Sequence, residues 1–439
     1  MLYYLKSVKK FPHKVINQLA LLRRDPVKFA NNLLQFTHPP LFEQRLIDIM
    51  NPMPMHVRID PTLRLRPSLN VLSSALTKEG MTGGPNTIIN LAFRVAQQGV
   101  PVRMVTTVET CTIEPDWFRT HAAELVGSTK LPEIPIVSAS KSDHPLSIGF
   151  NDVFMATHWT TAQQLKRILP HLCVQKFFYM LQEFEPSFYP WSSNYALALE
   201  TFGLDFFPVF NEAILADFFF DQALGRFADP DLHRCAMIFE PAIDDRLFHI
   251  GDKKLATRPR RLLFYARPSN TRNMFGLGLM ALRQASSHEM FRNGWEFFSI
   301  GSRGSVPSLS LENGNVLRPS PWMNYVGYAE LLRESDILLC PMLSPHTSYP
   351  VLEMAASGGI SVTNTFATKT REALYALSNN IIGAEPTIEA LADGIVEAAE
   401  RTNRGHVRSA SLNMARDWSE TLDPVASRMA EIFFQLSNV

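Results

Sequence analysis

The chain has 439 residues, which is enough for two or three domains of ordinary size. Hydrophobic residues make up 46% and charged residues 19%, a composition that excludes an intrinsically disordered protein. The formal net charge is zero, so composition gives no attraction to nucleic acid, and we expect no nucleic-acid partner.

Cysteine usage and apolar runs indicate a cytoplasmic protein. The four cysteines are scattered and form no CxxC pair, which favours reduced thiols without a metal or a disulfide. No apolar run reaches the ~20 residues of a membrane span. The amino end also shows no apolar signal-peptide core, so we expect a cytoplasmic location. The cysteines are Cys111, Cys173, Cys235 and Cys340.

The amino-terminal segment 1–38 alternates basic and apolar residues with a fair helical period, broken by Pro12 and Pro26. One interpretation is a basic amphipathic segment that contacts an anionic membrane surface from the cytoplasm. The other is a helix pair packed on the protein body, with its basic residues in water. We treat residues 1–60 as a helical extension.

The first α/β unit begins with a strand from Leu69 to Leu76 and a glycine-containing loop. A helix from Asn86 to Gln98 and a strand from Val100 follow, which together form a βαβ unit. Gly83 and Gly84 in the loop allow backbone to approach a ligand phosphate at the helix N-terminus. A glycine pair by itself is also typical of an ordinary tight turn.

Strand-like runs then recur up to residue 243, with helical segments between some of them, which predicts a mostly parallel, doubly wound sheet. Several runs end in polar residues that would line the crevice at the carboxyl ends of the strands. We expect Gln182 and Glu183 to bind an acceptor hydroxyl, although strand-end surface residues have the same pattern. The polar ends are His158 with Trp159, Gln182 with Glu183, and Asn211 with Glu212.

A second alternating series starts at Arg260, after a polar connector. Its first strand is followed by Arg267, and the next loop carries Arg272. Two cations five residues apart, at a strand end and on its loop, can converge on one diphosphate, and arginine adds a planar fork for oxygens. Two exposed surface arginines are the alternative.

The stretch from Ser335 to Phe366 reads as strand, loop, helix and strand. Its helix begins near Pro350, so the helix N-terminus lies at the carboxyl edge of the sheet, where it favours a phosphate. Glu353 lies one turn into that helix, where its carboxylate can accept hydrogen bonds from sugar hydroxyls.

This stretch resembles the signature of family 4 glycosyltransferases, which carry a Glu, a Gly-Phe-Gly-Leu-Pro run and a second Glu on a helix. Pro350 and the run Leu352–Ala355, which includes Glu353, match the second half. The first Glu is replaced by Pro345, and SPHTSYP replaces the glycine run. This variant is most similar to the rhamnosyltransferases of bacterial surface-glycan assembly, of the WsaF type.

The resemblance implies the GT-B fold: two doubly wound Rossmann-like domains that face each other across a cleft. It places an acceptor-side domain at residues 61–245 and a nucleotide-sugar-binding domain at 246–405. Helices in 406–439 would pack back on the first domain, with Trp418 and Phe433–Phe434 in the contact.

The resemblance also implies site residues. In that family the glycine pair lies near the donor phosphates and an Arg…Lys pair binds the pyrophosphate. His158 lies in a run similar to the family's Asp-Val-Val-His-Ala-His segment, which makes it the candidate acid, base or orienting residue; a structural histidine is the alternative. The implied catalytic residues are His158, Arg267 and Arg272, and the implied donor-binding residues are Gly83, Gly84, Arg267, Arg272, Leu317, Arg318, Ser348, Tyr349, Pro350 and Glu353.

The implied activity is a retaining transfer of a sugar, which we expect to be rhamnose from dTDP-rhamnose, to a glycan or lipid-linked saccharide in surface polysaccharide assembly. The resemblance implies no cofactor and no metal, and Asp229 and Asp231 have DxD spacing but read as a loop. The alternatives are a nucleotide-sugar epimerase or phosphorylase on the same scaffold, or an inactive GT-B partner protein.

Overall fold

The computed structural model describes residues 55–81, 83–109, 111–251, 258–302, 307–404 and 412–437. The basic segment 1–38 and most of the predicted amino-terminal extension lie outside the described residues. All contacts given below belong to the unit that begins at Met55. In this unit β1 (Val57–Ile59) already pairs with β5 (Leu146–Ile148), so the first body starts at residue 55 rather than at 61.

The first large sheet has the strand order β4-β3-β2-β6-β7-β8-β9, and every neighbouring pair in it is parallel. Its strands are β2 (Leu69–Ser73), β3 (Val102–Thr106), β4 (Ile136–Ser138), β6 (Val153–Ala156), β7 (Phe177–Leu181), β8 (Phe206–Asn211) and β9 (Met237–Phe239). Its helices are α5 (Gly84–Gln97), α6 (Pro115–Val126), α7 (Trp159–Ile168), α8 (Ser193–Glu200), α9 (Ala213–Gln222) and α10 (Pro230–Cys235).

Both faces of this sheet are covered, which explains why strands such as β6 and β7 are apolar throughout. All five residues of β7 are buried. Successive side chains of a strand point to opposite faces. In β2, accordingly, Val71 joins the hydrophobic cluster on one face and Leu72 joins the cluster on the other.

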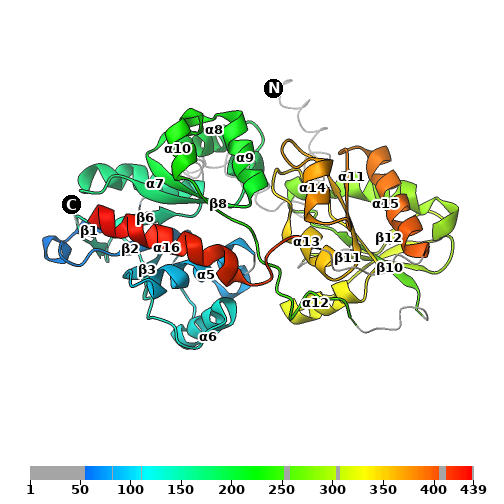
Figure 1. The fold of residues 1–439 in the computed structure, drawn as a ribbon, viewed down its shortest axis with the longest axis horizontal. Helices are drawn as coiled ribbons and strands as arrows, with labels where there is room; N and C mark the ends of the chain where they lie inside the picture. The colour runs from blue at the N-terminus through cyan, green and yellow to red at the C-terminus, as the bar shows by residue number, and fades with distance from the viewer. Residues whose placement is uncertain are drawn as a thin grey trace, which may run out of the picture. The chain divides into compact units, whose positions relative to one another are not determined.

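The second sheet has the order β12-β13-β11-β10-β14-β15-β16 and is parallel except for the short edge strand β12. Its strands are β10 (Arg260–Tyr265), β11 (Trp295–Ile300), β12 (Leu309–Ser310), β13 (Val316–Pro319), β14 (Ile337–Leu339), β15 (Ile360–Asn364) and β16 (Ile381–Ala384). Helices α11 (Phe275–Ser286) and α15 (Ile388–Asn403) cover one face, and α12 (Tyr325–Arg333), α13 (Tyr349–Ala356) and α14 (Arg371–Leu377) the other (Figure 1).

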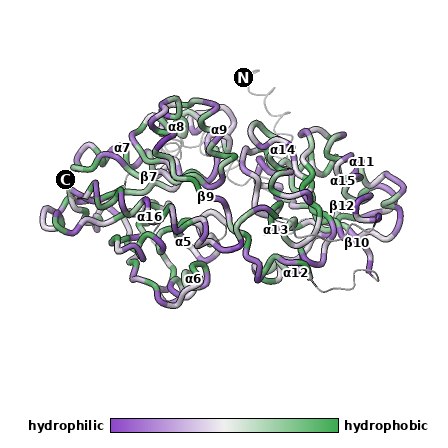
Figure 2. Tube along the Cα trace, viewed as in Figure 1, coloured by the Kyte–Doolittle hydropathy of each residue, from purple (hydrophilic) through white to green (hydrophobic). Residues whose placement is uncertain are grey.

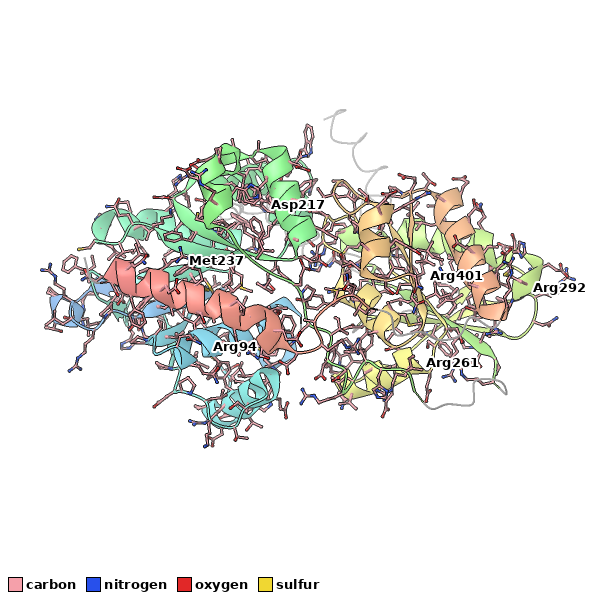
Figure 3. All side chains as sticks on the ribbon, in the orientation of Figure 1. Arg94, Asp217, Met237, Arg261, Arg292 and Arg401 are labelled. Carbon is pink, nitrogen blue, oxygen red and sulfur yellow. The ribbon has the colours of Figure 1, made fainter. Side chains whose placement is uncertain are left out.

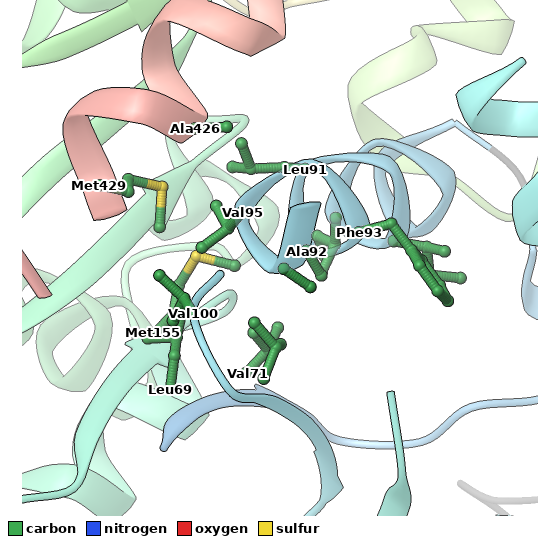
Figure 4. Packing of buried hydrophobic residues seen from close by; sticks show 14 of the residues in the cluster. Leu69, Val71, Leu91, Ala92, Phe93, Val95, Val100, Met155, Ala426 and Met429 are labelled. Carbon is green, nitrogen blue, oxygen red and sulfur yellow. The ribbon is translucent and has the colours of Figure 1, made fainter. Parts of the chain in front are cut away.

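The carboxyl-terminal helix α16 (Trp418–Ser437) packs on the first sheet's domain, alongside α5 (Figure 1). Its trace changes between hydrophilic and hydrophobic residues (Figure 2), as expected for a helix with one buried face. Ala426 and Met429 reach the cluster that contains Leu91 and Val95 of α5 (Figure 4). This contact explains why α5 itself is buried on more than one side.

The three aromatic residues predicted to dock α16 differ in burial. Phe433 is buried in the first domain's core and Trp418 packs against that core, whereas Phe434 is 42% exposed. A helix offers only one face to its neighbour, and adjacent residues lie about 100° apart around its axis. Polar contacts add to the docking: Arg94 of α5 (Figure 3) is buried and pairs with Asp423 of α16.

Each sheet is doubly wound, as predicted, and has one point where the winding direction reverses. In the first sheet the chain runs outward from β2 to β4 and then restarts at β6 beside β2. In the second it runs outward from β10 and restarts at β14 beside β10. Open α/β sheets bind ligands at such switch points, outside the carboxyl ends of the strands.

None of the helices in the described ranges is long and apolar enough to cross a membrane.

Candidate active site

The loops at the two switch points carry most of the predicted site residues. Gly83 follows β2, His158 follows β6, and Arg267 and Arg272 follow β10. Residues 340–348, between β14 and α13, complete the second switch point. Hydrogen bonds from this loop and from Arg272 reach the ends of β7 and β8 in the first sheet. The carboxyl ends of the two sheets are therefore in contact.

The glycine pair shapes the entrance to α5. Gly83 has φ +45°, a conformation that side chains rarely adopt, and Pro85 occupies the first turn of the helix. A Cβ on Gly84 would lie 3.1 Å from Nε2 of Gln182, which donates to the Gly84 carbonyl at 3.3 Å. Gln182 thus lies directly over the start of α5.

Glu183 joins the two sheets. Its carboxylate accepts hydrogen bonds from Arg272 and from the Ser344 hydroxyl, both of the second sheet's domain. Its Oε1 also accepts from the Phe184 N–H at 3.1 Å, and the Arg272 guanidinium lies 4.8 Å from the centre of the Phe188 ring. The side chain predicted to bind an acceptor is therefore buried and engaged in positioning Arg272.

Arg267 lies two residues beyond β10 and is half-buried. Among the residues that the structure describes, no ion pair joins it to a carboxylate, and its side chain hydrogen-bonds to that of Tyr265. Burial raises the pKa of the Cys340 thiol to about 12 and also raises the pKa of Tyr265, and the charge of Arg267 opposes both shifts. Within the described ranges, Arg267 is thus a cation near the loop that leads into α13 with no anion paired to it.

The loop before α13 keeps a glycine-like backbone without a glycine. Ser348 has φ +81° and is buried, and its N–H donates to Nδ1 of His346 at 2.9 Å. Such a φ is strained for a residue with a Cβ and persists where surrounding contacts enforce it. Pro350 occupies the first turn of α13. The conformation at this helix start is thereby retained although the sequence departs from the glycine run.

Glu353 is buried one turn into α13. Its Oε1 accepts from the Tyr325 hydroxyl at 2.8 Å and its Oε2 from the Tyr328 hydroxyl at 3.0 Å. Burial raises the pKa of Glu353 to about 7. A carboxylate has about four acceptor positions, so each oxygen keeps one for a ligand hydroxyl.

Glu212 follows the last residue of β8 and reaches the same loop. It is fully buried, with φ +87°, and its Oε2 accepts the Thr347 N–H at 2.8 Å. Nε2 of His346 lies 3.8 Å from that oxygen. Burial raises the pKa of Glu212 to about 7 and lowers that of His346 to about 4.

A buried lysine lies among the charged residues described above. We call Glu183, Glu212, Arg272 and this lysine the charge cluster. Lys369 lies between β15 and α14, and its Nζ donates to the Met342 carbonyl at 2.9 Å. Burial lowers its pKa to about 8, and the charges of Glu183 and Glu212 oppose this shift. At neutral pH the ammonium is therefore mostly charged, among carboxylates from the first sheet.

Tyr349 makes a further contact between the two sheets. Its hydroxyl accepts from Nδ2 of Asn211 at 2.9 Å and lies 3.4 Å from Oγ1 of Thr87 on α5. Burial raises the pKa of Tyr349 to about 12. The start of α13 is thus bound to the ends of β8 and to the first turn of α5.

His158 caps α7. Its Nδ1 accepts the Thr160 N–H at 3.3 Å, so the proton of the neutral ring is on Nε2, which lies 3.9 Å from Oε1 of Glu185. Burial lowers the pKa of His158 to about 4 and raises that of Glu185 to about 8. Glu185 also accepts the Trp159 N–H at 2.6 Å. At pH 7 both groups are mostly neutral, so Nε2 of His158 can donate a hydrogen bond and the Glu185 carboxyl group can donate a proton.

The predicted base-binding residues lie on β13. Leu317 is 1% exposed and its side chain belongs to the second sheet's core, and its part in a base site stays a prediction. The next residue, Arg318, points the other way and is exposed. Its contact with a base stays a prediction.

Asp229 and Asp231 form a helix start rather than a metal motif. Asp229 caps α10 by accepting the Asp231 N–H at 2.9 Å and pairs with Arg226 at 3.3 Å. Asp231 pairs with Arg234. No group of three or more possible metal ligands occurs within the described ranges.

A surface hollow lies beside the charge cluster, between α9 and the 367–370 turn. It is lined by Asp217 (Figure 3), Phe218, Asp221, Gln222, Ala367, Thr368 and Thr370. Its carboxylates belong to α9, and burial raises the pKa of Asp217. None of the lining residues was predicted as part of the site.

Two family models match the chain, and together they cover more than half of it. The model described as "WsaF, N-terminal domain" matches residues 68–212, and "WsaF, C-terminal domain" matches residues 260–396. The chain belongs to the WsaF family. The predicted resemblance to family 4 glycosyltransferases of the WsaF type is therefore confirmed.

A curated relative is the O-antigen biosynthesis protein RfbC of Myxococcus xanthus, which is 32% identical over 286 residues, or 62% of this chain. The chain spans about a fifth of the length of that relative, because the match covers 20% of it.

Solved structures support the GT-B fold, which is confirmed. The crystal structure of Anabaena HepE in complex with UDP-glucose has a TM-score of 0.50 at 11% identity and covers 84% of this chain and 97% of its own. The N-terminal domain of the Candida albicans trehalose-6-phosphate phosphatase also has a TM-score of 0.50 at 11% identity, with 88% and 100% covered. At these identities the likeness concerns the fold alone.

Several charged residues of the site were not singled out from the sequence. Glu185 and Lys369 were missed, and Glu212 was placed on the crevice wall without a role. The signal for Glu212 was a charged residue directly after an apolar strand. Lys369 lies in a polar turn, where a lysine is ordinary, so only its burial marks it.

Proposed function

We propose that this WsaF-family chain is a glycosyltransferase that moves a sugar from a nucleoside-diphosphate sugar to a hydroxyl of a glycan or lipid-linked saccharide in surface polysaccharide assembly. The observation that carries the proposal is Arg267, a cation without a protein anion, beside Arg272 and the start of α13 at a switch point. A diphosphate fits that combination, since arginine forks and helix N–H groups both bind phosphate oxygens.

Departure of the diphosphate is the step that the second sheet supports. The bond between the anomeric carbon and the diphosphate oxygen breaks, and negative charge grows on that oxygen. Arg267 and Arg272 stabilise this charge where it develops, as preorganised cations do in other transferases. Arg272 has to exchange part of its contact with Glu183 for the phosphate, or hold both at once. These two cations let the reaction proceed without a metal.

Attack by the acceptor belongs to the first sheet in this proposal. The acceptor oxygen bonds to the anomeric carbon on the face that the diphosphate leaves, which retains configuration, and its proton passes to the leaving phosphate oxygen. His158 orients the acceptor hydroxyl through Nε2, and Glu185 positions the ring. No enzyme nucleophile is required.

The donor in this proposal is dTDP-rhamnose. The rings of His346 and Tyr349, 5.7 Å apart between centroids, and the Ser348 backbone surround the start of α13. An apolar ring surface suits the methyl group of a deoxysugar better than a hydroxymethyl group. The WsaF family match supports this choice of sugar, and Glu353 is placed to accept hydroxyls of the donor.

A thermal-shift panel of the full chain with dTDP, UDP and GDP, with and without EDTA, tests the proposal. We expect dTDP to raise the melting temperature most, and EDTA to leave that shift unchanged. Stabilisation by GDP and none by dTDP would overturn the assigned nucleotide. No response to any of the three would overturn nucleotide-sugar transfer itself.

One further measurement separates the epimerase alternative. Incubation of dTDP-rhamnose with the chain and no acceptor should leave the sugar intact apart from slow hydrolysis. Formation of a different dTDP-sugar under these conditions would indicate an epimerase instead.

A further inference from the structure

Four buried acceptor atoms at the contact between the two sheets have no hydrogen bond among the described residues. Three follow β7 and β8 of the first sheet, and one lies in the loop before α13. Buried polar atoms are paired in the great majority of cases, and each orphan costs about 1–3 kcal/mol. The four are Oε1 of Gln182, Oδ1 of Asn211, Oε1 of Glu212 and Oγ1 of Thr347.

These residues are held in place by their other polar atoms. Gln182 donates its amide to Gly84, Asn211 donates to Tyr349, and Oε2 of Glu212 accepts the Thr347 N–H. The Thr347 hydroxyl also lies within reach of the Glu212 carboxylate and lowers its pKa as a hydrogen-bond donor, although the geometry between the two is poor. In Gln182, Asn211 and Glu212, therefore, one polar atom of the side chain forms a hydrogen bond that holds it in place. The other polar atom forms none among the described residues.

Glu212 is also strained. Its φ of +87° puts a residue with a Cβ in a region that glycine prefers, and the residue is fully buried. Strain of this kind costs on the order of 1–3 kcal/mol and persists at binding sites more often than elsewhere. A glycine here would relieve both the strain and the burial of charge, but it would leave the Thr347 N–H without its acceptor.

The orphans are acceptors, apart from the Thr347 hydroxyl, which can also donate. Their complement is therefore a ligand rich in O–H donors, which is the chemistry of a sugar ring. Cations lie next to them: the charge of Lys369 acts on Glu212, and Arg272 and Lys369 both act on His346. A sugar attached to a diphosphate would present its hydroxyls to the acceptors while the cations hold the phosphates.

We infer that Glu212, Asn211, Gln182 and Thr347 bind the hydroxyl groups of the donor sugar, with Glu212 as the principal acceptor. This inference rests on the proposed function and extends it to the sugar half of the donor. It gives the first sheet a direct part in donor recognition. It also gives a reason for the Pro345 variant: a carboxylate from β8 reaches the loop that carries no acidic residue of its own between Ser344 and Tyr349.

Titration calorimetry of the full chain with matched ligands tests the inference. The ligand pairs are dTDP with dTDP-rhamnose and UDP with UDP-glucose, and the quantity compared is the Kd of the sugar nucleotide divided by that of its diphosphate. For Glu212→Gln we expect this ratio to rise about tenfold or more, since a hydrogen bond to a charged acceptor is lost, while the Kd of the diphosphate changes less than twofold.

Thr347→Val supplies a second test with an opposite effect on stability. The substitution keeps the volume and removes a buried hydroxyl without a partner, so the melting temperature of the free protein should stay equal or rise. The Kd ratio should still increase, by about threefold or more. A protein that is at least as stable but binds the sugar less well cannot owe the loss to misfolding.

Glu240→Gln is the matched control. Glu240 is a partly buried carboxylate that accepts the Ala213 N–H at 2.9 Å, at the start of the same helix α9 that follows Glu212. Its burial also raises its pKa. We expect this variant to leave the Kd ratio within twofold of the wild type.

Each remaining outcome overturns the inference. An unchanged ratio in both variants means that the orphan atoms bind water only. Equal weakening of diphosphate and sugar nucleotide in Glu212→Gln means that Glu212 supports the fold rather than the sugar. If the wild-type chain binds neither ligand pair, the proposed function fails together with the inference. If the wild-type chain binds the ligands and the variants bind them equally well, only the inference fails.

Discussion

The two switch points have the same topology but different chemistry. The end of the second sheet presents cations, Arg267 and Arg272, and the N-terminus of α13. The end of the first sheet presents acceptors and carboxylates, among them Glu183 and Glu212. Because the two ends are in contact, each sheet's charges are partly neutralised by the other's. A donor that carries a diphosphate at one end and hydroxyls at the other matches this division.

The contacts between the ends also show how the division is stabilised. Glu183 and Tyr349 each bond across from one sheet's domain to the other. A carboxylate buried in this way is costly unless it is paired, and Glu183 is paired with Arg272. This ion pair fixes the position of Arg272. The short turn that carries Arg272 in the second sheet's domain would not hold the side chain in place by itself.

Removal of Arg267, which forms no ion pair among the described residues, should break the comparison most clearly. For Arg267→Ala we expect the affinity for dTDP to fall about 30-fold or more and transfer to fall at least 100-fold, since the developing charge loses a preorganised donor. Calorimetry and a transfer assay measure the two effects. Arg283→Ala is the control, because Arg283 forms an exposed pair with Glu312 at 3.0 Å on the same domain. An unchanged dTDP affinity in Arg267→Ala would contradict a diphosphate site here.

Removal of the ion pair between Glu183 and Arg272, which joins the carboxyl ends of the two sheets, should have the next largest effect. Glu183→Gln keeps the shape but leaves Arg272 without its anion, so we expect the unfolding free energy to fall by about 2–4 kcal/mol. Denaturant unfolding measures it, and a double-mutant cycle with Arg272→Gln measures the coupling. Additive losses in the cycle would show that the contact contributes nothing to stability.

The pH dependence of stability should show that Glu353, the buried carboxylate of the second sheet's domain, has a raised pKa. The folded pKa of Glu353, about 7, lies above its unfolded value near 4.3. The stability contributed by this group is therefore fully present below pH ~4.3 and is lost as the pH rises through about 7. For Glu353→Gln we expect the fall of stability between pH 5 and 7 to become shallower, by up to ~1.4 kcal/mol per pH unit.

Denaturant unfolding at several pH values gives these slopes. The Glu200→Gln variant is a suitable comparison, because the hydrogen bond from Lys166 lowers the pKa of Glu200, so its linkage has the opposite sign. Parallel curves for wild type and Glu353→Gln would mean that Glu353 titrates at its ordinary pKa.

The smallest expected effect concerns the scaffold of the first sheet and not its carboxyl end. Asp423→Asn removes the anion that pairs with buried Arg94, and Asp423 itself is half exposed, so we expect a loss of about 1 kcal/mol. Thermal unfolding should show the shift, while the affinity for dTDP stays the same. A large loss of dTDP affinity would mean that α16 contributes to the site and not only to the first domain.

The alternation of apolar runs and the position of turn residues were sufficient to predict the first doubly wound sheet, and the resemblance to a known family supplied the second. Runs such as β7 and β14 are apolar throughout because they are covered on both faces, and this pattern is local. The sequence was less informative where the outcome depended on a face rather than on a run. Leu317 and Phe434 each lie beside a residue of the opposite exposure, and the sequence alone does not say which of the two points inward.

The sequence by itself determined that Gly83, His158 and Arg267 lie in loops after strands and that Glu353 lies one turn into a helix, because strand, turn and helix signals are local. Only the tertiary structure decided that Glu183 pairs with Arg272, 89 positions away, and that Glu212 meets Thr347, 135 positions away. Separations of this size leave no periodic trace in a sequence. They depend on how two independently wound sheets bring their carboxyl ends together, which burial and pairing of charges determine.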